Sequence, residues 1–260
     1  MIRALSRLCA GFLLAGLFTG CATKLYIPGN RFMSPEASGE LLKGDFKVGG
    51  VGVTHVEVAD DITSASPNTT PLLLKNSSME LGLQLGLASR LDAYYNIVFG
   101  APSAVGLKLQ LIGDTAQNSK KGNFSLAIAG GAFIGNLKTT ATVGSDTGNS
   151  DVNFGGYEAL IPIGYRANDG FLVYVTPFQS HVTAAVDIKR TSGGVTTTTA
   201  QPNGFGVMRG VTLGLRLGGG VFLALEASGT ETTWTREQPS TLESTKFSDT
   251  AIGAAIGGQW

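Results

Sequence analysis

Cysteine, histidine and charged residues are scarce in this sequence. The chain of 260 residues holds two cysteines and two histidines, and 15% of it is charged, against about 25% in typical soluble domains. Basic and acidic residues cancel at 19 each. Because there is no basic excess and no Lys/Arg cluster interleaved with aromatics, nucleic acid is excluded as a partner.

Long hydrophobic runs are also missing after Cys21, where no stretch reaches about 18 unbroken apolar residues, so no transmembrane helix is predicted. At the start, Arg3 and Arg7 precede an apolar stretch of about 11 residues, which suits a signal peptide and is too short to span a membrane. Residues 18–21, Phe-Thr-Gly-Cys, resemble a bacterial lipobox.

That resemblance implies a diacylated Cys21 as the mature N-terminus, and Ala22 after it favours sorting to the outer membrane. Cleavage by ordinary signal peptidase after a nearby alanine is the alternative. Cys9 would leave with the signal peptide, so Cys21 would have no disulfide partner in an oxidising compartment. An acyl chain explains the remaining thiol better than a disulfide does.

Three parts of the chain follow from composition. Residues 1–20 are predicted to be a signal peptide. Residues 21–45 are polar, broken by proline and glycine, and are predicted to be a lipidated N-terminal tether. Residues 46–260 alternate between apolar and polar positions, which predicts β-strands.

The alternation predicts about ten strands, with eight or twelve as alternatives. They lie near residues 46–58, 79–88, 93–100, 104–112, 123–135, 152–166, 170–186, 204–217, 220–228 and 247–260. Short links and long polar links alternate between most of them, as in transmembrane barrels. The predicted fold class is all-β, a closed antiparallel transmembrane β-barrel.

The two faces of these strands differ in polarity. Leu83, Leu85 and Leu87 share one face of the second strand, and Glu80 and Gln84 share the other. A bilayer admits strands only as a closed barrel, so the leucines are expected to face lipid. The predicted lumen charges, balanced between three acids and three bases, are Glu80, Lys108, Glu158, Arg166, Arg216 and Glu226. A barrel of this size is expected to be plugged by side chains rather than to conduct.

Aromatic residues on the lipid-facing side are predicted to form a girdle at one membrane interface. Its members are Tyr95, Phe124, Tyr165, Phe171 and Trp260. The last strand places Ile252, Ile256 and Trp260 on one face, and this ending resembles the assembly signal of outer-membrane barrels in Gram-negative bacteria. Together with the lipobox, the chain resembles a lipidated outer-membrane barrel. That implies outer-membrane lipids, the barrel assembly machinery and the lipoprotein sorting machinery as partners, besides a possible surface ligand that the sequence does not identify.

The candidates for catalysis or metal binding are the surroundings of the two histidines and the acidic run at residues 146–151. His55 and Glu57 share a face and are spaced for contact, whereas Ser180 and His181 point to opposite faces and cannot act as nucleophile and base. The run Asp146–Asp151 is ordinary turn chemistry rather than a calcium site. No enzyme activity, metal or cofactor is predicted.

The predicted function is structural or one of surface interaction, for a protein anchored by lipid in the outer membrane. Three alternatives remain: a small passive pore, a lipid-modifying outer-membrane enzyme, and a soluble lipocalin-like lipoprotein. The lipocalin alternative lacks the usual Gly-X-Trp near the first strand, because the chain has tryptophan only at positions 234 and 260.

Overall fold

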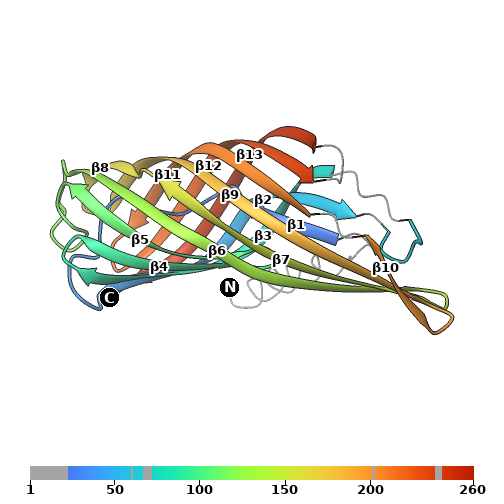
Figure 1. Cartoon of the computed structure of the whole chain (residues 1–260). Helices are drawn as coiled ribbons and strands as arrows, with labels where there is room; N and C mark the ends of the chain where they lie inside the picture. The colour runs from blue at the N-terminus through green and yellow to red at the C-terminus, as the bar shows by residue number, and fades with distance from the viewer. Residues whose placement is uncertain (1–22, 60, 67–71, 201–202, 238–241) are drawn as a thin grey trace, which may run out of the picture.

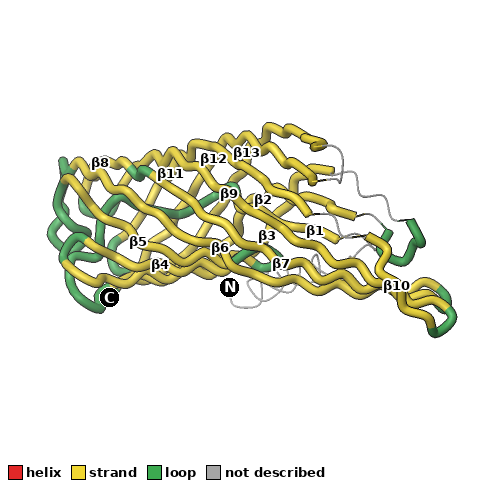
Figure 2. The backbone as a smooth tube through the Cα atoms, viewed as in Figure 1, coloured by secondary structure: helices red, strands yellow, loops and turns green. Residues whose placement is uncertain are grey.

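The protein is an all-β molecule whose strands wind into one barrel (Figures 1 and 2). The computed structural model describes residues 23–59, 61–66, 72–200, 203–237 and 242–260. Cys21 and the predicted signal peptide lie outside these residues. No helix that could cross a membrane occurs in the described part. The strands are β1(Thr23–Pro28), β2(Gly44–Ala59), β3(Leu72–Ala88), β4(Leu91–Val98), β5(Ser103–Ile112), β6(Phe124–Val143), β7(Asp146–Leu160), β8(Ile163–Asn168), β9(Phe171–Ser192), β10(Val195–Ala200), β11(Asn203–Gly218), β12(Val221–Glu237) and β13(Leu242–Gln259).

The barrel is closed by antiparallel pairing of its last strand with β2. The pairs run from Ala254 opposite Gly50 to Gln259 opposite Asp45. β7 and β8 act as one barrel strand, because both pair with β6 on one side and β9 on the other. Counted in this way, ten antiparallel strands form the wall. The predicted ten-stranded closed barrel is confirmed.

The two ends of the barrel are unlike. One end carries tight turns such as the one between β3 and β4, together with the C-terminus, and we call it the short-turn end (Figure 1). The other carries the extended hairpins β6–β7 and β9–β10 and is called the long-hairpin end.

Side chains alternate between the outside and the inside of the wall as predicted. On β3, Leu81 and Leu83 are 40% and 45% exposed, whereas Glu80 is 2% exposed. β12 repeats this pattern, with Leu223 and Leu225 exposed and Glu226 buried. The apolar residues therefore cover the outside, and polar residues line much of the inside.

Several strands are longer than the sequence indicated. Segments expected to be polar loops continue as paired strands: Asn136–Val143 lies along Asp146–Asn153, and the β12–β13 pairing continues to Glu237 opposite Leu242. These segments are rich in threonine, whose branched side chain fits a pleated surface. The loss of apolar alternation marked where the outer face becomes polar, not where the strands end.

Within the expected tether, residues 23–45 differ most from the prediction. β1 pairs with the second half of β2, from Thr23 opposite Ala59 to Pro28 opposite Val53. The chain then runs inside the barrel toward the short-turn end, as the blue segment of Figure 1 shows. Residues 29–38 are all buried, and we call them the plug segment. Apolar and polar residues do not alternate regularly in this segment, because a chain inside the lumen is surrounded by the barrel wall and has no solvent-facing side.

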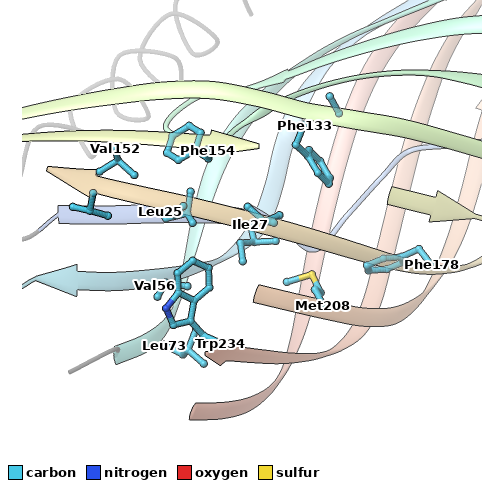
Figure 3. Close-up of a cluster of buried hydrophobic side chains, with 14 of the residues drawn as sticks. Leu25, Ile27, Val56, Leu73, Phe133, Val152, Phe154, Phe178, Met208 and Trp234 are labelled. Carbon is cyan, nitrogen blue, oxygen red and sulfur yellow. The ribbon is translucent and has the colours of Figure 1, made fainter. Parts of the chain in front are cut away.

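The interior has two zones. Toward the long-hairpin end it is an apolar core in which Leu25 and Ile27 of β1 pack with Val56, Val152 and Trp234 (Figure 3). Toward the short-turn end it is polar and holds the plug segment. Each zone fills the lumen in its own way, by apolar packing in one and by hydrogen bonds and ion pairs in the other.

Candidate functional site: the plugged lumen

All six predicted lumen charges are buried in the wall, between 0% exposed for Lys108 and 8% for Arg216. The sequence suggested that they would pair with one another. Instead, most of them contact the plug segment, which supplies its own charges. The site is therefore an interface between the wall and residues 29–38.

Arg31 lies at the centre of this interface. Its Nε donates to Oε2 of Glu158 at 3.0 Å, and one terminal nitrogen donates to the hydroxyl of Ser180 at 2.9 Å. Its guanidinium lies 4.4 Å from the ring centroid of Phe178. The backbone N–H of Arg31 donates to the carboxylate of Glu226 at 2.8 Å. One residue thus joins the plug segment to β7, β9 and β12.

A second set of contacts holds the plug segment nearer the short-turn end. Lys108 Nζ donates to the carbonyl oxygen of Ser34 at 3.1 Å and to that of Glu36 at 2.6 Å, and it lies 3.4 Å from a carboxylate oxygen of Asp92. The carboxylate of Glu36 forms a bidentate ion pair with Arg166. Backbone and side chains of the plug are therefore both recognised.

The backbone of the plug is satisfied by further wall groups. The N–H of Ala37 donates to Gln110 at 2.7 Å, and the N–H of Ser38 donates to Asp92 at 3.1 Å. Lys47 Nζ donates to the carbonyl oxygen of Arg31 at 3.2 Å, and it lies 3.4 Å from Glu80. Since an unpaired buried backbone group costs about as much as a lost hydrogen bond, these contacts hold the segment without regular structure.

Two tyrosines that point into the lumen donate hydrogen bonds to the buried carboxylates of Glu158 and Glu226. The hydroxyl of Tyr94 donates to Glu158 at 3.0 Å, and that of Tyr174 donates to Glu226 at 2.9 Å. A Cβ at Gly214 would lie 2.1 Å from the Tyr174 ring, so glycine there lets the ring lie against the wall. Part of the high glycine content thus makes room for inward aromatics.

Arg216 serves a different purpose from the other five charges. It pairs with Asp45 at 3.2 Å and donates to Gln259 at 3.2 Å, and its guanidinium lies 3.6 Å from the ring centroid of Phe222. Asp45 and Gln259 are opposite each other where β2 meets β13. Arg216 therefore stabilises the closure of the barrel.

Little space is left inside. Between Arg31, Glu80 and Asn96 lies an internal cavity of about 20 Å³, room for about one water molecule. This cavity is far smaller than a ligand site, and its lining includes Arg31 of the plug segment and Glu158 of the wall. What it does chemically is hold a chain segment in place.

On the outside, the predicted girdle and terminal strand are exposed. Tyr95, Phe124, Tyr165 and Trp260 are between 44% and 51% exposed, and Phe171 is partly exposed. Phe124 and Tyr165 are cross-strand partners near the short-turn end. Ile252 and Ile256 are also exposed on β13. Exposure of large apolar side chains around the wall is the second feature of the site.

The histidines lie in unrelated places. Ser180 points inward to Arg31, whereas His181 points outward and stacks on Tyr157 at 5.1 Å, so the two are on opposite faces as predicted. His55 Nε2 lies 3.6 Å from Glu57. No group of three metal-ligating side chains occurs among the residues with described positions.

The predicted turn at Asp146 forms the tip of the β6–β7 hairpin. Asp146 accepts hydrogen bonds from Ser192 and Arg190 of the neighbouring hairpin, and these hold the pKa of its carboxyl below the ordinary value. Asp151 instead pairs with Lys138 at 3.3 Å. The two carboxylates thus belong to separate contacts.

Sequence reasoning missed the plug partners Arg31, Glu36, Lys47 and Asp92. Asp92 lies just before the predicted strand at residues 93–100, whereas in the structure it begins the buried face of β4. The sequence did hold one signal that could have found them. Arg31 and Glu36 carry opposite charges, and no other residue between 29 and 38 is charged.

No protein-family model matches the chain, and no curated protein resembles it in sequence at a significant level.

Proposed function

We propose that this protein is an outer-membrane β-barrel with a permanently closed lumen, which acts as a structural or surface-interaction component rather than as a channel or enzyme. The observation that carries the proposal is the combination of an apolar exterior with a lumen occupied by the chain's own residues 29–38. Each half of this combination supports a different part of the conclusion.

The apolar exterior supports a lipid environment. Leu107, Leu213 and Ile256 are 51%, 57% and 58% exposed on three different strands, and similar residues occur around the wall. In water, each such side chain would lose about 25 cal/mol of stabilising free energy for every Å² of apolar surface that stays exposed instead of being buried. Soluble monomers rarely expose one contiguous apolar patch of more than a few hundred Å².

The filled lumen argues against two alternatives. A passive pore needs a continuous water path, and a lipocalin-like carrier needs an internal cavity, typically about 300 Å³ or more for a ligand. Arg31 and its partners occupy the space that either would use. For the lipid-modifying enzyme, the opposite facing of Ser180 and His181 means that this hydroxyl and this imidazole cannot act together as nucleophile and base.

Lipidation of Cys21 belongs to the same proposal. β1 begins opposite Ala59, at the long-hairpin end, while the C-terminus lies at the short-turn end. Cys21 precedes Thr23 by two residues, a reach of about 7 Å. If the short-turn end faces the periplasm, β1 begins on the cell-surface side of the barrel, and an acyl anchor on Cys21 would hold the chain from that side.

The test uses the two tryptophans in vesicles with brominated acyl chains, which quench only fluorophores near lipid. Trp260 is 47% exposed and Trp234 is 1% exposed. The single-tryptophan variants Trp234→Phe and Trp260→Phe separate their signals. We expect strong quenching of Trp260 and almost none of Trp234.

Two readouts accompany this test. Heat-modifiable migration in detergent reports that each variant is folded, and discrete conductance steps in planar bilayers would contradict the closed lumen. Equal, weak quenching of both tryptophans in a folded protein would contradict the membrane location.

A further inference from the structure

The outer face of the barrel carries a hollow that the proposed function does not use. It has a volume of about 680 Å³ and is lined mostly by apolar surface. Its floor includes Ile161, Pro177, Val211 and Gly229, and Arg209 with Gln179 borders it. The residues that line it come from β7, the link to β8, β9, β11, β12 and β13.

Small outward residues create this hollow. Gly229 faces outward between Ala227 and Glu231, and a Cβ added there would meet nothing within 4 Å. Pro177 on β9, which is separated from β12 by β11, has a short side chain. The flanking outward positions instead carry larger side chains, among them Leu213 and Tyr157, so the wall is locally recessed.

The height of the hollow follows from the register of the strands. Phe171 pairs with Leu217 near the short-turn end, and Gln179 pairs with Arg209 eight residues further along β9. At the usual rise and tilt this separation is about 20 Å along the barrel axis. The apolar band of such barrels is about 25 Å tall, which places Arg209 close to its edge on the long-hairpin side.

An aromatic row just beyond Arg209 marks the same level. The rings of Tyr157, His181 and Phe205 stack side by side on the outer face, with centroids 5.1 Å and 5.8 Å apart. Tyr157 is 59% exposed. Amphipathic rings are favoured at the headgroup level of a membrane.

The charge around the hollow favours an anion at Arg209. The acids that border it already have cationic partners: Glu231 pairs with Lys246 at 2.7 Å, and Asp249 pairs with Lys75 at 3.3 Å. Arg209 donates its Nε to the neutral Gln179 at 3.0 Å, and Glu231, which lies opposite Arg209 in the register of β11 and β12, pairs with Lys246 instead. Guanidinium groups bind phosphate in a bidentate way.

We infer that this hollow binds a phosphorylated, multiply acylated glycolipid of the lipid A type, with its phosphate on Arg209 and its acyl chains over the floor formed by Ile161, Val211 and Gly229. The inference rests on the proposed membrane location. A lipid with several chains fits better than a two-chain phospholipid, because five neighbouring strands line the hollow, a width of about 20 Å at normal strand spacing.

The test is native mass spectrometry of the detergent-solubilised barrel with monophosphoryl lipid A as the probe. Phosphatidylglycerol and the same lipid A after removal of its phosphate are the comparison lipids. We expect the wild type to retain monophosphoryl lipid A in preference to both.

Three variants test whether the lipid binds at the hollow: two change the hollow, and one changes the barrel elsewhere. Arg209→Gln removes the charge, and we expect it to weaken retention about tenfold, since hydrogen bonds to charged groups are the strong ones. Gly229→Phe places a ring over the floor at a position where an added Cβ meets nothing within 4 Å, and it should weaken retention of all acylated probes. Lys138→Gln removes an exposed charge from the β6–β7 hairpin and should change nothing.

Several outcomes would overturn the inference. Unchanged retention in Arg209→Gln and Gly229→Phe would show that the hollow is not the site. Equal retention of phosphatidylglycerol would show a general lipid surface instead of a glycolipid site. Heat-modifiable migration and quenching of Trp260 are measured in the same samples, so a failure of membrane insertion is distinguished from a failure of this inference alone.

Discussion

Replacing Arg31 by methionine is the most direct perturbation of the plugged lumen. Arg31 is 4% exposed and donates to Glu158 at 3.0 Å and to Ser180 at 2.9 Å. Methionine has similar length and fits beside Phe178, so the main change is the loss of charge and donors. Glu158 would then remain buried with only the hydroxyl of Tyr94 as a partner.

The expected magnitude follows from this geometry. Removal of one partner of a buried ion pair costs about 3–5 kcal/mol, because an uncompensated charge stays in the interior. We therefore expect Arg31→Met to lower the free energy of unfolding by that amount. The double variant Arg31→Met/Glu158→Leu should recover at least about 1 kcal/mol of the loss, since it also removes the stranded charge.

The assay is equilibrium urea unfolding of the barrel in lipid vesicles, followed by the fluorescence of Trp234 inside the apolar zone. Lys138→Met, at a solvent-exposed pair with Asp151, serves as the control and should change the free energy by less than about 1 kcal/mol. If Arg31→Met behaved like this control, Arg31 would not be buried against Glu158, and the closed lumen would lose its basis.

Further predictions address the exterior, the lumen and a hairpin tip. Leu213→Arg on the apolar exterior should cost about 2–4 kcal/mol in vesicles, whereas Thr140→Arg on the polar extension of β6 should cost little; equal effects would contradict a lipid-facing Leu213. Replacement of residues 29–38 by a Gly/Ser sequence should produce conductance steps that the wild type lacks, because the wall charges would be hydrated; a silent variant that still shows heat-modifiable migration would count against the plug. Asp146 should titrate below its ordinary pKa of 3.8, and Ser192→Ala should raise that pKa, as carboxyl NMR can measure. Because the pKa of Asp146 is lower in the folded state, its contacts stabilise the hairpins at neutral pH. This stabilisation is lost as the pH falls through the folded-state pKa.

The barrel itself could be predicted because its physical cause is local. The period of two on β3, with Leu81 and Leu83 opposite Glu80, fixes which face meets which environment wherever the strand pairs. Ten such runs, an even number, are joined by links that let consecutive strands pair antiparallel. Ten strands paired in this way can close into a barrel. The same argument placed Ser180 and His181 on opposite faces, and the structure decided that Ser180 is the one that points inward.

Strand ends were harder to predict for a reason that concerns solvent. Beyond residue 136 of β6 the outer face becomes polar, so the apolar alternation stops although pairing with β7 continues to Asp146. The sequence therefore reported the extent of the apolar band and not the extent of the hydrogen-bonded ladder.

By itself the sequence determined the wall, its two faces and the charges that face inward, since each depends on residue type and on spacing along one strand. Only the tertiary structure decided what fills the wall. Arg31 lies 127 positions from Glu158 and 195 from Glu226. No local period connects such residues, and an irregular segment finds its partners only when the closed wall surrounds it.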